Sequence, residues 1–433
     1  MRAGRTLHIG MSLAPTWLSG DAWRRADSGI EGHFSSDLYL DIARRAEAAR
    51  LDFVFRPDTL FLDARAVEAG PGFASLDPTL LLAAIARETS RIGLLSTMST
   101  TFYPPYVVAR QIQSLNWLTN GRAGWNIVTA LDGNENFGLP AMPSAQERYD
   151  RAAEFTQVVR ALWASFPFEA LRLDRAAGTY ADAALVRPLD HEGTHFRVRG
   201  PLNLPAARAP IPLVQAGASP EGRDFAAAVA DAVFVSTPDR EAAIDIRKDM
   251  NNRAQAQGRA HGDVLVLPGL SLYLAASRSE ARELFAHTHA RADRARKIAG
   301  IREMTGLDLS DWEETRPVTA ADLPPAPAKV RSRTHAELLR RLIAREEPPL
   351  AELLRRPEVT GSAHWRIVGT VDDAVDEILD WAAAGAMDGF IALPGGCLDA
   401  VRLFLEGVVP RLVEAGRFRA AYAGETFADH LRD

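Results

Sequence analysis

Short apolar runs alternate along the chain with longer segments in which apolar residues recur every three or four positions. The runs cover 7–13, 52–58, 92–100, 123–130, 211–217, 232–237, 264–275 and 389–394. Amphipathic segments between them cover 36–50, 78–90, 106–118, 147–163, 220–230 and 371–384. Parallel sheets built from strands and crossover helices show this alternation. The eight units predict an α/β protein, a (β/α)8 TIM barrel with right-handed crossovers.

The chain is longer than such a barrel requires. About 250 residues suffice for the fold, whereas this chain has 433. We therefore expect one barrel domain over 1–433, with insertions at about 59–77, 167–210 and 277–364. The third insertion carries helical periodicity and two glycines, Gly300 and Gly306, that could act as hinges. We interpret it as a lid, with a separate small domain as the alternative.

Composition describes a globular protein and excludes several partners. Apolar residues make up 47% and charged residues 24%, and the formal net charge is −6. That balance argues against nucleic acid or an acidic membrane as the main partner, because both attract clustered positive charge. Cys397 is the only cysteine, so no internal disulfide or thiolate metal cluster can form. With no signal peptide or membrane-spanning run in view, we expect a cytoplasmic protein.

One stretch matches a metalloprotease motif by letter only. His191-Glu192-Gly193-Thr194-His195 reads H-E-x-x-H, but both histidines reach one zinc ion only when the segment is helical. Pro188 and Gly193 disfavour a helix here. We expect a β-turn leading into a short strand, and no metal site.

The turn from Gln215 to Arg223 joins an apolar run to a predicted helix. Ser219 suits the N-cap position and Pro220 the first helical position. The free N–H groups of a helix start could hold a phosphate, and Gly217 would allow close approach of the backbone. The alternative is an ordinary capped turn between a strand and a helix.

Other motifs of nucleotide binding or nucleophilic catalysis are missing from the sequence. There is no G-x-G-x-x-G after a strand, no P-loop and no G-x-S-x-G elbow. Cys397 follows two glycines near the last strand, and we interpret it as a buried or incidental thiol. We therefore assign no catalytic residue.

The predicted strands end in polar rather than charged residues. In a TIM barrel the reacting groups come from these carboxyl ends. The residues are Asp58, Ser99, Thr100, Thr101, Asn126, Thr129 and Ser219. Such a set suits hydrogen bonding to a large heteroaromatic ligand better than a metal site rich in carboxylates.

Several stretches together resemble a known family. They are 120–130 (NGRAGWNIVTA), 99–102 with 105–106, 136–138, 147–152, 195–196 with 200–203, and 215–219. In this order and spacing the chain resembles the bacterial luciferase-like flavin monooxygenases. The branch it resembles contains the nitrilotriacetate, dibenzothiophene-sulfone, dimethyl-sulfide and long-chain alkane monooxygenases.

The resemblance implies the oxygenase component of a two-component monooxygenase. FMN would arrive as FMNH2 from a separate NAD(P)H-dependent flavin reductase, with O2 as co-substrate. The flavin C4a-hydroperoxide formed in this family would oxygenate a small organic substrate, for example an organosulfur compound or an amine. A homo-oligomer is also implied.

The resemblance also implies which residues bind the cofactor. Ser219 and Ala218 would hold the phosphate together with the Tyr149 hydroxyl, at a turn opened by Gly217. The isoalloxazine or ribityl chain would be surrounded by the polar strand ends Asp58, Ser99, Thr100 and Asn126.

The chain departs from the family at three places expected near the flavin or the substrate entrance. Ala145 stands where members often have histidine, Ser19 and Gly20 replace another histidine position, and Arg56-Pro57 replaces apolar residues. Two alternatives stay open. One is a deazaflavin-dependent hydride-transfer oxidoreductase on the same barrel, and the other is a non-catalytic flavin-binding protein.

Overall fold

The computed structural model describes residues 6–432 apart from 218, 291–293, 328–329 and 331. Eight parallel strands form a closed barrel in it. In ring order they are β1 (His8–Ser12), β2 (Phe53–Arg56), β3 (Gly93–Ser99), β4 (Ala123–Val128), β9 (Leu213–Ala216), β10 (Ala232–Val235), β11 (Leu265–Leu274) and β13 (Gly389–Pro394). The pairing of β10 with β11 and of β13 with β1 closes the ring. These are the eight predicted strands, so the TIM barrel is confirmed.

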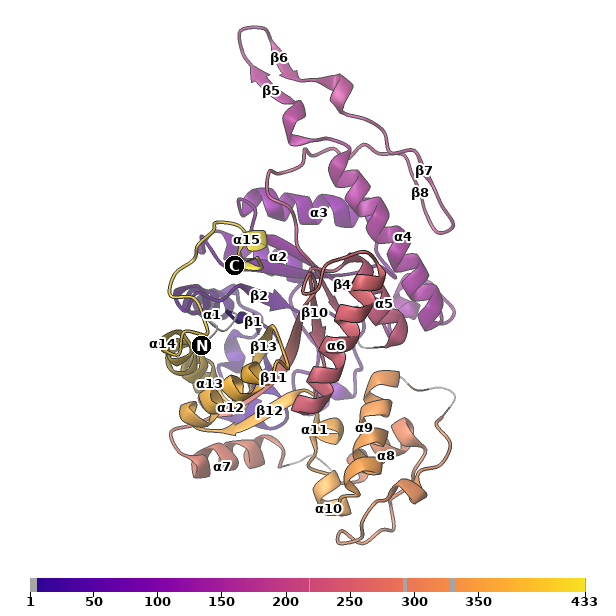
Figure 1. The fold of residues 1–433 in the computed structure, drawn as a ribbon, viewed down its shortest axis with the longest axis vertical. Coiled ribbons are helices and arrows are strands. Elements are labelled where there is room, and N and C mark those ends of the chain that lie inside the picture. Colours follow the sequence, from indigo (N-terminus) through magenta and orange to yellow (C-terminus); the bar gives the residue numbers. More distant parts are fainter. Residues whose placement is uncertain (1–5, 218, 291–293, 328–329, 331, 433) are drawn as a thin grey trace.

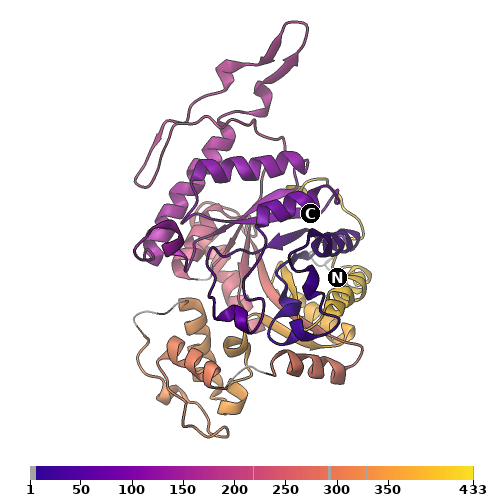
Figure 2. The same ribbon diagram turned by 180° about the vertical axis from the view of Figure 1, so that it is seen from behind.

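Helices surround this ring on its outer side (Figures 1 and 2). They are α1 (Ser36–Ala48), α2 (Pro78–Ala86), α3 (Pro105–Leu118), α4 (Ala145–Ala164), α5 (Pro220–Val229), α6 (Arg240–Ala256), α12 (Val371–Ala383), α13 (Leu398–Arg402) and α14 (Val409–Glu414). Six were predicted, whereas α6 and the last two were not. No helix in the described part of the chain is long and apolar enough to cross a membrane.

Alternate strand residues fill the barrel interior. Phe53, Phe55, Leu95 and Leu267 belong to this inner cluster, whereas their chain neighbours pack outward against the helices. The short C-terminal helix α15 (Phe427–His430) closes the end of the barrel where the strands begin. Its Phe427 ring lies 5.2 Å from the Phe53 ring, between centroids, and is fully buried.

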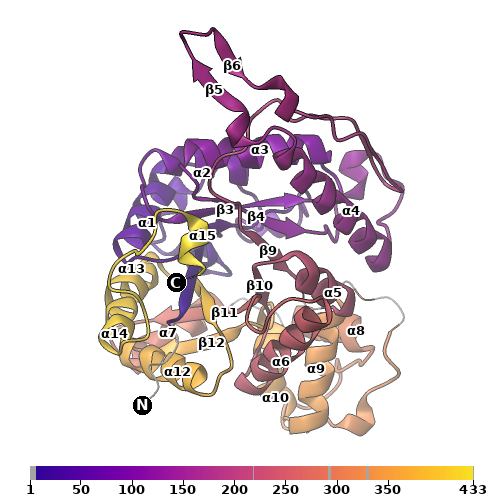
Figure 3. The same cartoon turned by 45° about the horizontal axis from the view of Figure 1, so that its top comes forward.

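Two of the predicted insertions contain little regular structure. The 59–77 segment is a loop with one 3-10 turn, Ala66–Glu68. The 167–210 segment forms two antiparallel hairpins, β5 (Leu171–Asp174) with β6 (Thr179–Ala181) and β7 (His191–Glu192) with β8 (Arg197–Val198). Figure 3 shows the first hairpin extending well away from the barrel.

The third insertion is helical. It contains α7 (Arg278–Thr288), α8 (Arg294–Thr305), α9 (Arg333–Glu346), α10 (Leu350–Leu353) and α11 (Pro357–Thr360). The last four helices share an apolar cluster that includes Ile301, Leu339 and Leu353. In Figure 1 this group lies beside α6, next to the end of the barrel where the strands finish.

A ninth parallel strand, β12 (Trp365–Gly369), was not predicted. It pairs with the second half of β11, Leu270 to Leu274, whereas β10 pairs with the first half. Buried and half-buried residues alternate along β12, but the apolar Val368 at a half-buried position breaks the alternation of apolar and polar residues in the sequence. The five-residue length made it too short to separate from the preceding insertion.

The fold gives a prediction about the barrel floor. Replacing Phe427 by alanine should lower the free energy of unfolding by about 3–5 kcal/mol, because a buried aromatic ring would leave a cavity. Urea denaturation of the full chain measures this change. Phe73, which is 73% exposed, supplies the control, and Phe73→Ala should change stability by less than about 0.5 kcal/mol. Equal effects of the two variants would contradict this role of α15.

Candidate functional site

The carboxyl ends of β3 and β4 present polar side chains to the barrel interior. The Asn126 amide donates to the Thr97 hydroxyl oxygen at 2.9 Å, and that hydroxyl donates to the Arg56 carbonyl at 2.7 Å. Asn126 is 3% exposed, and its Oδ1 has no hydrogen-bond partner in the described part of the chain. A buried amide oxygen left unpaired is costly. It can therefore accept a hydrogen bond from a ligand.

Ser99 and Thr100 end the β3 side of this wall. The Ser99 hydroxyl accepts from the Thr101 N–H at 3.1 Å, and the Thr100 hydroxyl donates to the Val128 carbonyl at 3.3 Å. The second of these bonds ties the end of β3 to the end of β4, whereas the first lies within the end of β3. Both predicted residues are thus buried at the barrel mouth, with hydroxyl lone pairs left for a ligand. Thr97 was missed, although it precedes Ser99 by two positions and so shares its face.

Asp58 follows β2, the strand next to β3. Burial is the largest influence on the pKa of its carboxyl and raises it, and the Asp77 carboxylate raises this pKa further. The Thr59 N–H and the Arg56 guanidinium lower it, and the net shift is upward. A carboxyl with a raised pKa takes up a proton more readily than an exposed one. Asp58 is therefore suited to exchange hydrogen bonds with a polar ring edge.

A small cradle forms where β9 leads into α5. The Ser219 hydroxyl accepts from the Gly222 N–H at 3.1 Å, so Ser219 is the predicted N-cap. The Tyr149 hydroxyl reaches this turn from α4. A Cβ added at Gly217 would lie 2.7 Å from the Tyr149 oxygen, and one at Gly222 only 2.6 Å from it. Glycine at both positions leaves room for the hydroxyl.

The cradle fits a phosphate group. It combines a helix start, whose free N–H groups carry partial positive charge, with the hydroxyls of Ser219 and Tyr149. Gln215, which sequence reasoning missed, donates to the Tyr149 oxygen at 3.4 Å, and its buried Oε1 has no partner among the described residues. The structure thus brings Tyr149, Gly217 and Ser219 together. Ala218, the other predicted phosphate residue, lies outside the described residues.

Arg56, one of the departures from the family, does not lie near the flavin or substrate entrance, where we expected it. Arg56 points out of the barrel, where its guanidinium packs 5.4 Å from the centre of the Tyr39 ring of α1 and donates to the Leu13 carbonyl. It is 2% exposed. The side chain therefore joins β2 to α1 and does not line the predicted entrance. Ala145 is the first residue of α4.

The H-E-x-x-H stretch lies in the β7–β8 hairpin, so the expected turn and strand are present. Glu154 of α4 anchors the hairpin. Its carboxylate is 3.0 Å from the His191 Nε2 and accepts from the N–H groups of His195 and Phe196, both at 2.9 Å. Only His191 contributes its ring to this contact. No cluster of three or more potential metal ligands occurs among the described residues.

Cys397 caps the start of α13 and is buried. Burial is the main cause that raises the pKa of its thiol. A buried thiol with a raised pKa is a poor nucleophile, which agrees with the interpretation as an incidental residue.

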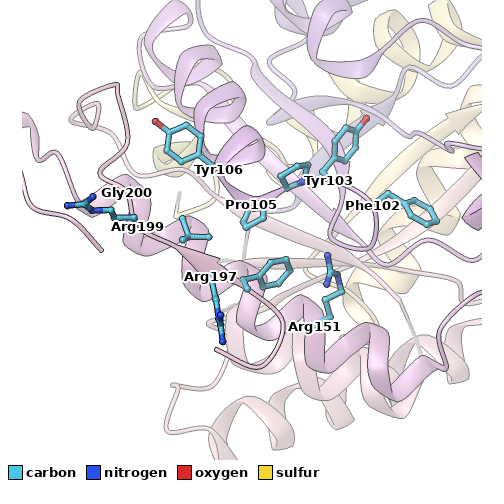
Figure 4. A pocket seen from close by; sticks show the side chains of 11 residues that line it. Phe102, Tyr103, Pro105, Tyr106, Arg151, Arg197, Arg199 and Gly200 are labelled. Atoms are coloured by element: carbon cyan, nitrogen blue, oxygen red, sulfur yellow. The ribbon is translucent and has the colours of Figure 1, made fainter. Parts of the chain in front are cut away.

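A groove of about 530 Å³, which the sequence did not predict, lies beside the barrel mouth (Figure 4). Aromatic residues from the start of α3 and the β7–β8 hairpin line it. The Arg151 guanidinium lies 4.3 Å from the centre of the Phe196 ring, and its Nε donates to the Thr100 carbonyl at 3.4 Å. Arg151 thus connects the hairpin to the polar wall, whereas Arg199 points away from it.

Comparison with known proteins agrees with this fold. A family described as luciferase-like monooxygenase matches residues 21–388. The chain is 34% identical to the dibenzothiophene-sulfone monooxygenase of Rhodococcus erythropolis, over 95% of this chain and 92% of that protein. It is 33% identical to the nitrilotriacetate monooxygenase component A of Aminobacter aminovorans, over 100% and 97%.

A solved structure shows the same fold. The EDTA monooxygenase from Chelativorans sp. BNC1 is 29% identical, with a TM-score of 0.82 over 99% of this chain and 98% of that chain. The closed barrel and these similarities define a barrel enzyme of the monooxygenase class. The chain belongs to the luciferase-like monooxygenase family, and this branch of the family is flavin-dependent.

The Glu154 anchor gives a second prediction. Glu154→Ala removes three hydrogen bonds to a charged acceptor, each worth about 1.5–3 kcal/mol. The β7–β8 hairpin should then be cleaved faster in limited proteolysis, while the barrel stays folded. Glu192→Ala, an exposed change in the same hairpin, is the control.

The same anchor should depend on pH. Burial raises the pKa of Glu154, but the donors from His191, His195 and Phe196 outweigh it, so the net shift is downward. A carboxylate with a lowered pKa stabilises the fold above its unfolded pKa of about 4.3. Protection of the hairpin should therefore be complete at pH 6 and lost as the pH falls below 4. Protection that stays unchanged down to the pH at which the barrel itself unfolds would exclude Glu154 as the anchor.

Proposed function

We propose that this protein is the oxygenase component of a two-component, FMNH2-dependent monooxygenase acting on a small organic substrate. The observation that carries the proposal is the cradle at Ser219, together with the unpaired Asn126 oxygen on the adjoining wall. Membership of a flavin-dependent family supports it. The reduced flavin would supply the electrons with which O2 is split between substrate and water.

The chain's own residues would bind and orient the cofactor. Ser219, Tyr149 and the first N–H groups of α5 would hold the FMN phosphate, at a turn kept open by Gly217. Asn126, Ser99, Thr100 and Asp58 would hydrogen-bond the ring or the ribityl chain, in the order in which β4, β3 and β2 stand in the sheet.

We further propose that the insertion 277–364 is a lid that excludes water from the barrel mouth. Three ion pairs join its helix α9 to the barrel helices. Arg333 lies 3.6 Å from Glu221 of α5, Arg341 lies 3.0 Å from Asp245 of α6, and Arg345 lies 3.1 Å from Asp239. Glu221 lies in the first turn of α5, whose N-cap residue is Ser219. The insertion therefore stands next to the proposed phosphate site.

The electrons would come from another protein. The sequence has no glycine pattern for a nicotinamide dinucleotide, so an NAD(P)H-dependent flavin reductase would deliver FMNH2. We also expect a homo-oligomer, because Leu80 of α2 and Leu118 of α3 leave 73% and 67% of their surfaces exposed.

The cradle predicts a phosphate-specific loss of affinity. Tyr149→Phe and Gly222→Ala should each weaken FMN binding about tenfold, because one hydrogen bond to a charged group is lost or displaced. Riboflavin, which lacks the phosphate, should bind both variants as it binds the unchanged chain. Flavin fluorescence quenching measures both. Gly300→Ala is the control, since a Cβ there meets no atom within 4 Å. Equal losses for FMN and riboflavin would place the phosphate elsewhere.

The two-component scheme predicts how oxygen is consumed. With a flavin reductase, NADH and FMN supplied, the chain should give substrate-dependent O2 uptake in an oxygen electrode. Without the reductase it should not oxidise NADH at a useful rate. Rapid NADH oxidation by the chain alone would overturn the scheme. Tighter binding of a deazaflavin than of FMN would favour hydride transfer instead.

A further inference from the structure

Charged side chains join the insertion to the barrel helices α5 and α6. The apolar cluster that connects α8, α9, α10 and α11 contains no residue of α5 or α6 among the described residues. Arginines of α9 instead pair with carboxylates of these two helices. Figures 1 and 3 show α9 next to both of them. Pairs of exposed charges are weak and are screened by salt, so we expect the docking of α9 on the barrel to be reversible.

Three arginines of α9 face the barrel helices. Arg333, Arg341 and Arg345 are spaced so that they lie within about a third of the helix circumference. Arg341 and Arg345 donate hydrogen bonds to carboxylates of α6, at 3.0 and 3.1 Å. Arg333 differs, because its Nη1 lies 3.6 Å from the Glu221 Oε1 of α5, which is beyond the usual length of a hydrogen bond. The contacts with α6 therefore hold α9, whereas the contact with α5 can adjust.

Glu221 lies close to the place where the cradle would hold a phosphate. It is the second residue of α5, after the N-cap Ser219 and the first helical residue Pro220. Pro220 has no N–H, and the Gly222 N–H already donates to the Ser219 hydroxyl. The Glu221 N–H has no acceptor among the described residues. A phosphate at this helix start would accept from it, and would then stand close to the carboxylate of the same residue.

A phosphate and the Glu221 carboxylate repel each other. The Glu221 side chain is 21% exposed, and its buried Oε2 has no partner in the described part of the chain. Burial strengthens the repulsion between two negative charges. Arg333 faces the other carboxylate oxygen and offsets part of this charge. Arg148 of α4 also interacts electrostatically with Glu221, but it belongs to a barrel helix. Arg333 is therefore the cation whose distance from Glu221 depends on α9.

We propose that Arg333 couples the cradle to the insertion, so that docking of α9 raises the affinity for a phosphate and a bound phosphate holds α9 in place. A docked α9 lowers the repulsion that the phosphate meets, and the phosphate strengthens the attraction of the turn for Arg333. Coupling between two equilibria acts equally in both directions. This inference rests on the proposed function, because it describes how the same site is regulated. It makes the phosphate, and not the flavin ring, the group that secures α9.

The first test separates the phosphate from the rest of the flavin. FMN and riboflavin are titrated against the full chain by fluorescence quenching at low ionic strength. Arg333→Gln should weaken FMN binding about threefold to tenfold and leave riboflavin binding unchanged. Arg302→Gln is the matched control, because Arg302 of α8 pairs with Asp308 inside the insertion. This variant should bind FMN like the unchanged chain, and an equal loss in both variants would overturn the proposal.

A double-mutant cycle tests whether Arg333 acts through Glu221. Glu221→Gln removes the repulsion, so FMN should bind this variant at least as tightly as the unchanged chain. Adding Arg333→Gln to Glu221→Gln should then change the FMN affinity by less than about twofold. An undiminished loss in the double variant would overturn the coupling, because Arg333 would then act without Glu221.

Amide hydrogen exchange in α9 measures the opposite direction of the coupling. FMN should slow this exchange in the unchanged chain, inorganic phosphate alone should slow it to a smaller extent, and riboflavin should leave it unchanged. In Arg333→Gln, saturating FMN should no longer slow it. A purely structural role of Arg333 would speed the exchange by the same factor with and without FMN, and that result would overturn the proposal.

The different ligands distinguish failure of this proposal from failure of the proposed function. Equal protection of α9 by FMN and riboflavin would retain the flavin site and reject the coupling through the phosphate. Protection of α9 by inorganic phosphate, without binding of either flavin, would retain the coupling and reject the flavin. If neither FMN nor inorganic phosphate binds the chain, both proposals fail.

Discussion

The pairing of β11 with its three neighbouring strands is the interaction on which the site depends. This ten-residue strand bonds to β10 with its first residues, to β13 with its middle and to β12 with its last. It thereby closes the ring and also carries the surface that receives the insertion. Because all strands of the ring run parallel, Asn126, Ser99 and the turn at Ser219 reach the same end of the barrel. An open sheet would not bring these segments together.

The bonds of the cradle serve folding first. Ser219 satisfies the N–H of Gly222, and Pro220 has no N–H to satisfy, so part of the helix start is already stabilised without a ligand. The remaining N–H groups keep their partial charge. The Tyr149 hydroxyl is placed by the packing of α4 against α5, with its ring 5.9 Å from that of Phe225. The cradle is thus preformed by the fold.

Periodicity made the barrel predictable, and local spacing made Ser219 predictable as a cap. Contacts between distant segments were not predictable in this way. Gln215 meets Tyr149 across 66 residues, and Glu154 holds a hairpin 37 residues further on. Arg56 points outward because successive residues of a strand point to opposite faces of the sheet. An error of one residue in the expected position therefore moves a side chain to the other face. Tyr149 was predicted only from the resemblance to the family, because no rule of sequence spacing indicates that its hydroxyl lies beside the turn at Ser219.

The barrel mouth has two unlike walls. In the ring, β3 and β11 stand opposite each other, with four steps between them in the strand order. The β3 and β4 wall offers neutral hydrogen-bonding groups, whereas the β11 and β12 wall offers Arg366 beside aromatic rings. The first wall belongs to the barrel itself. The second includes β12, which directly follows the insertion, and helix α9 of that insertion also contacts α5 through Arg333 and Glu221. Because β12 and the insertion lie outside the ring of eight strands, this wall can vary while the ring stays closed.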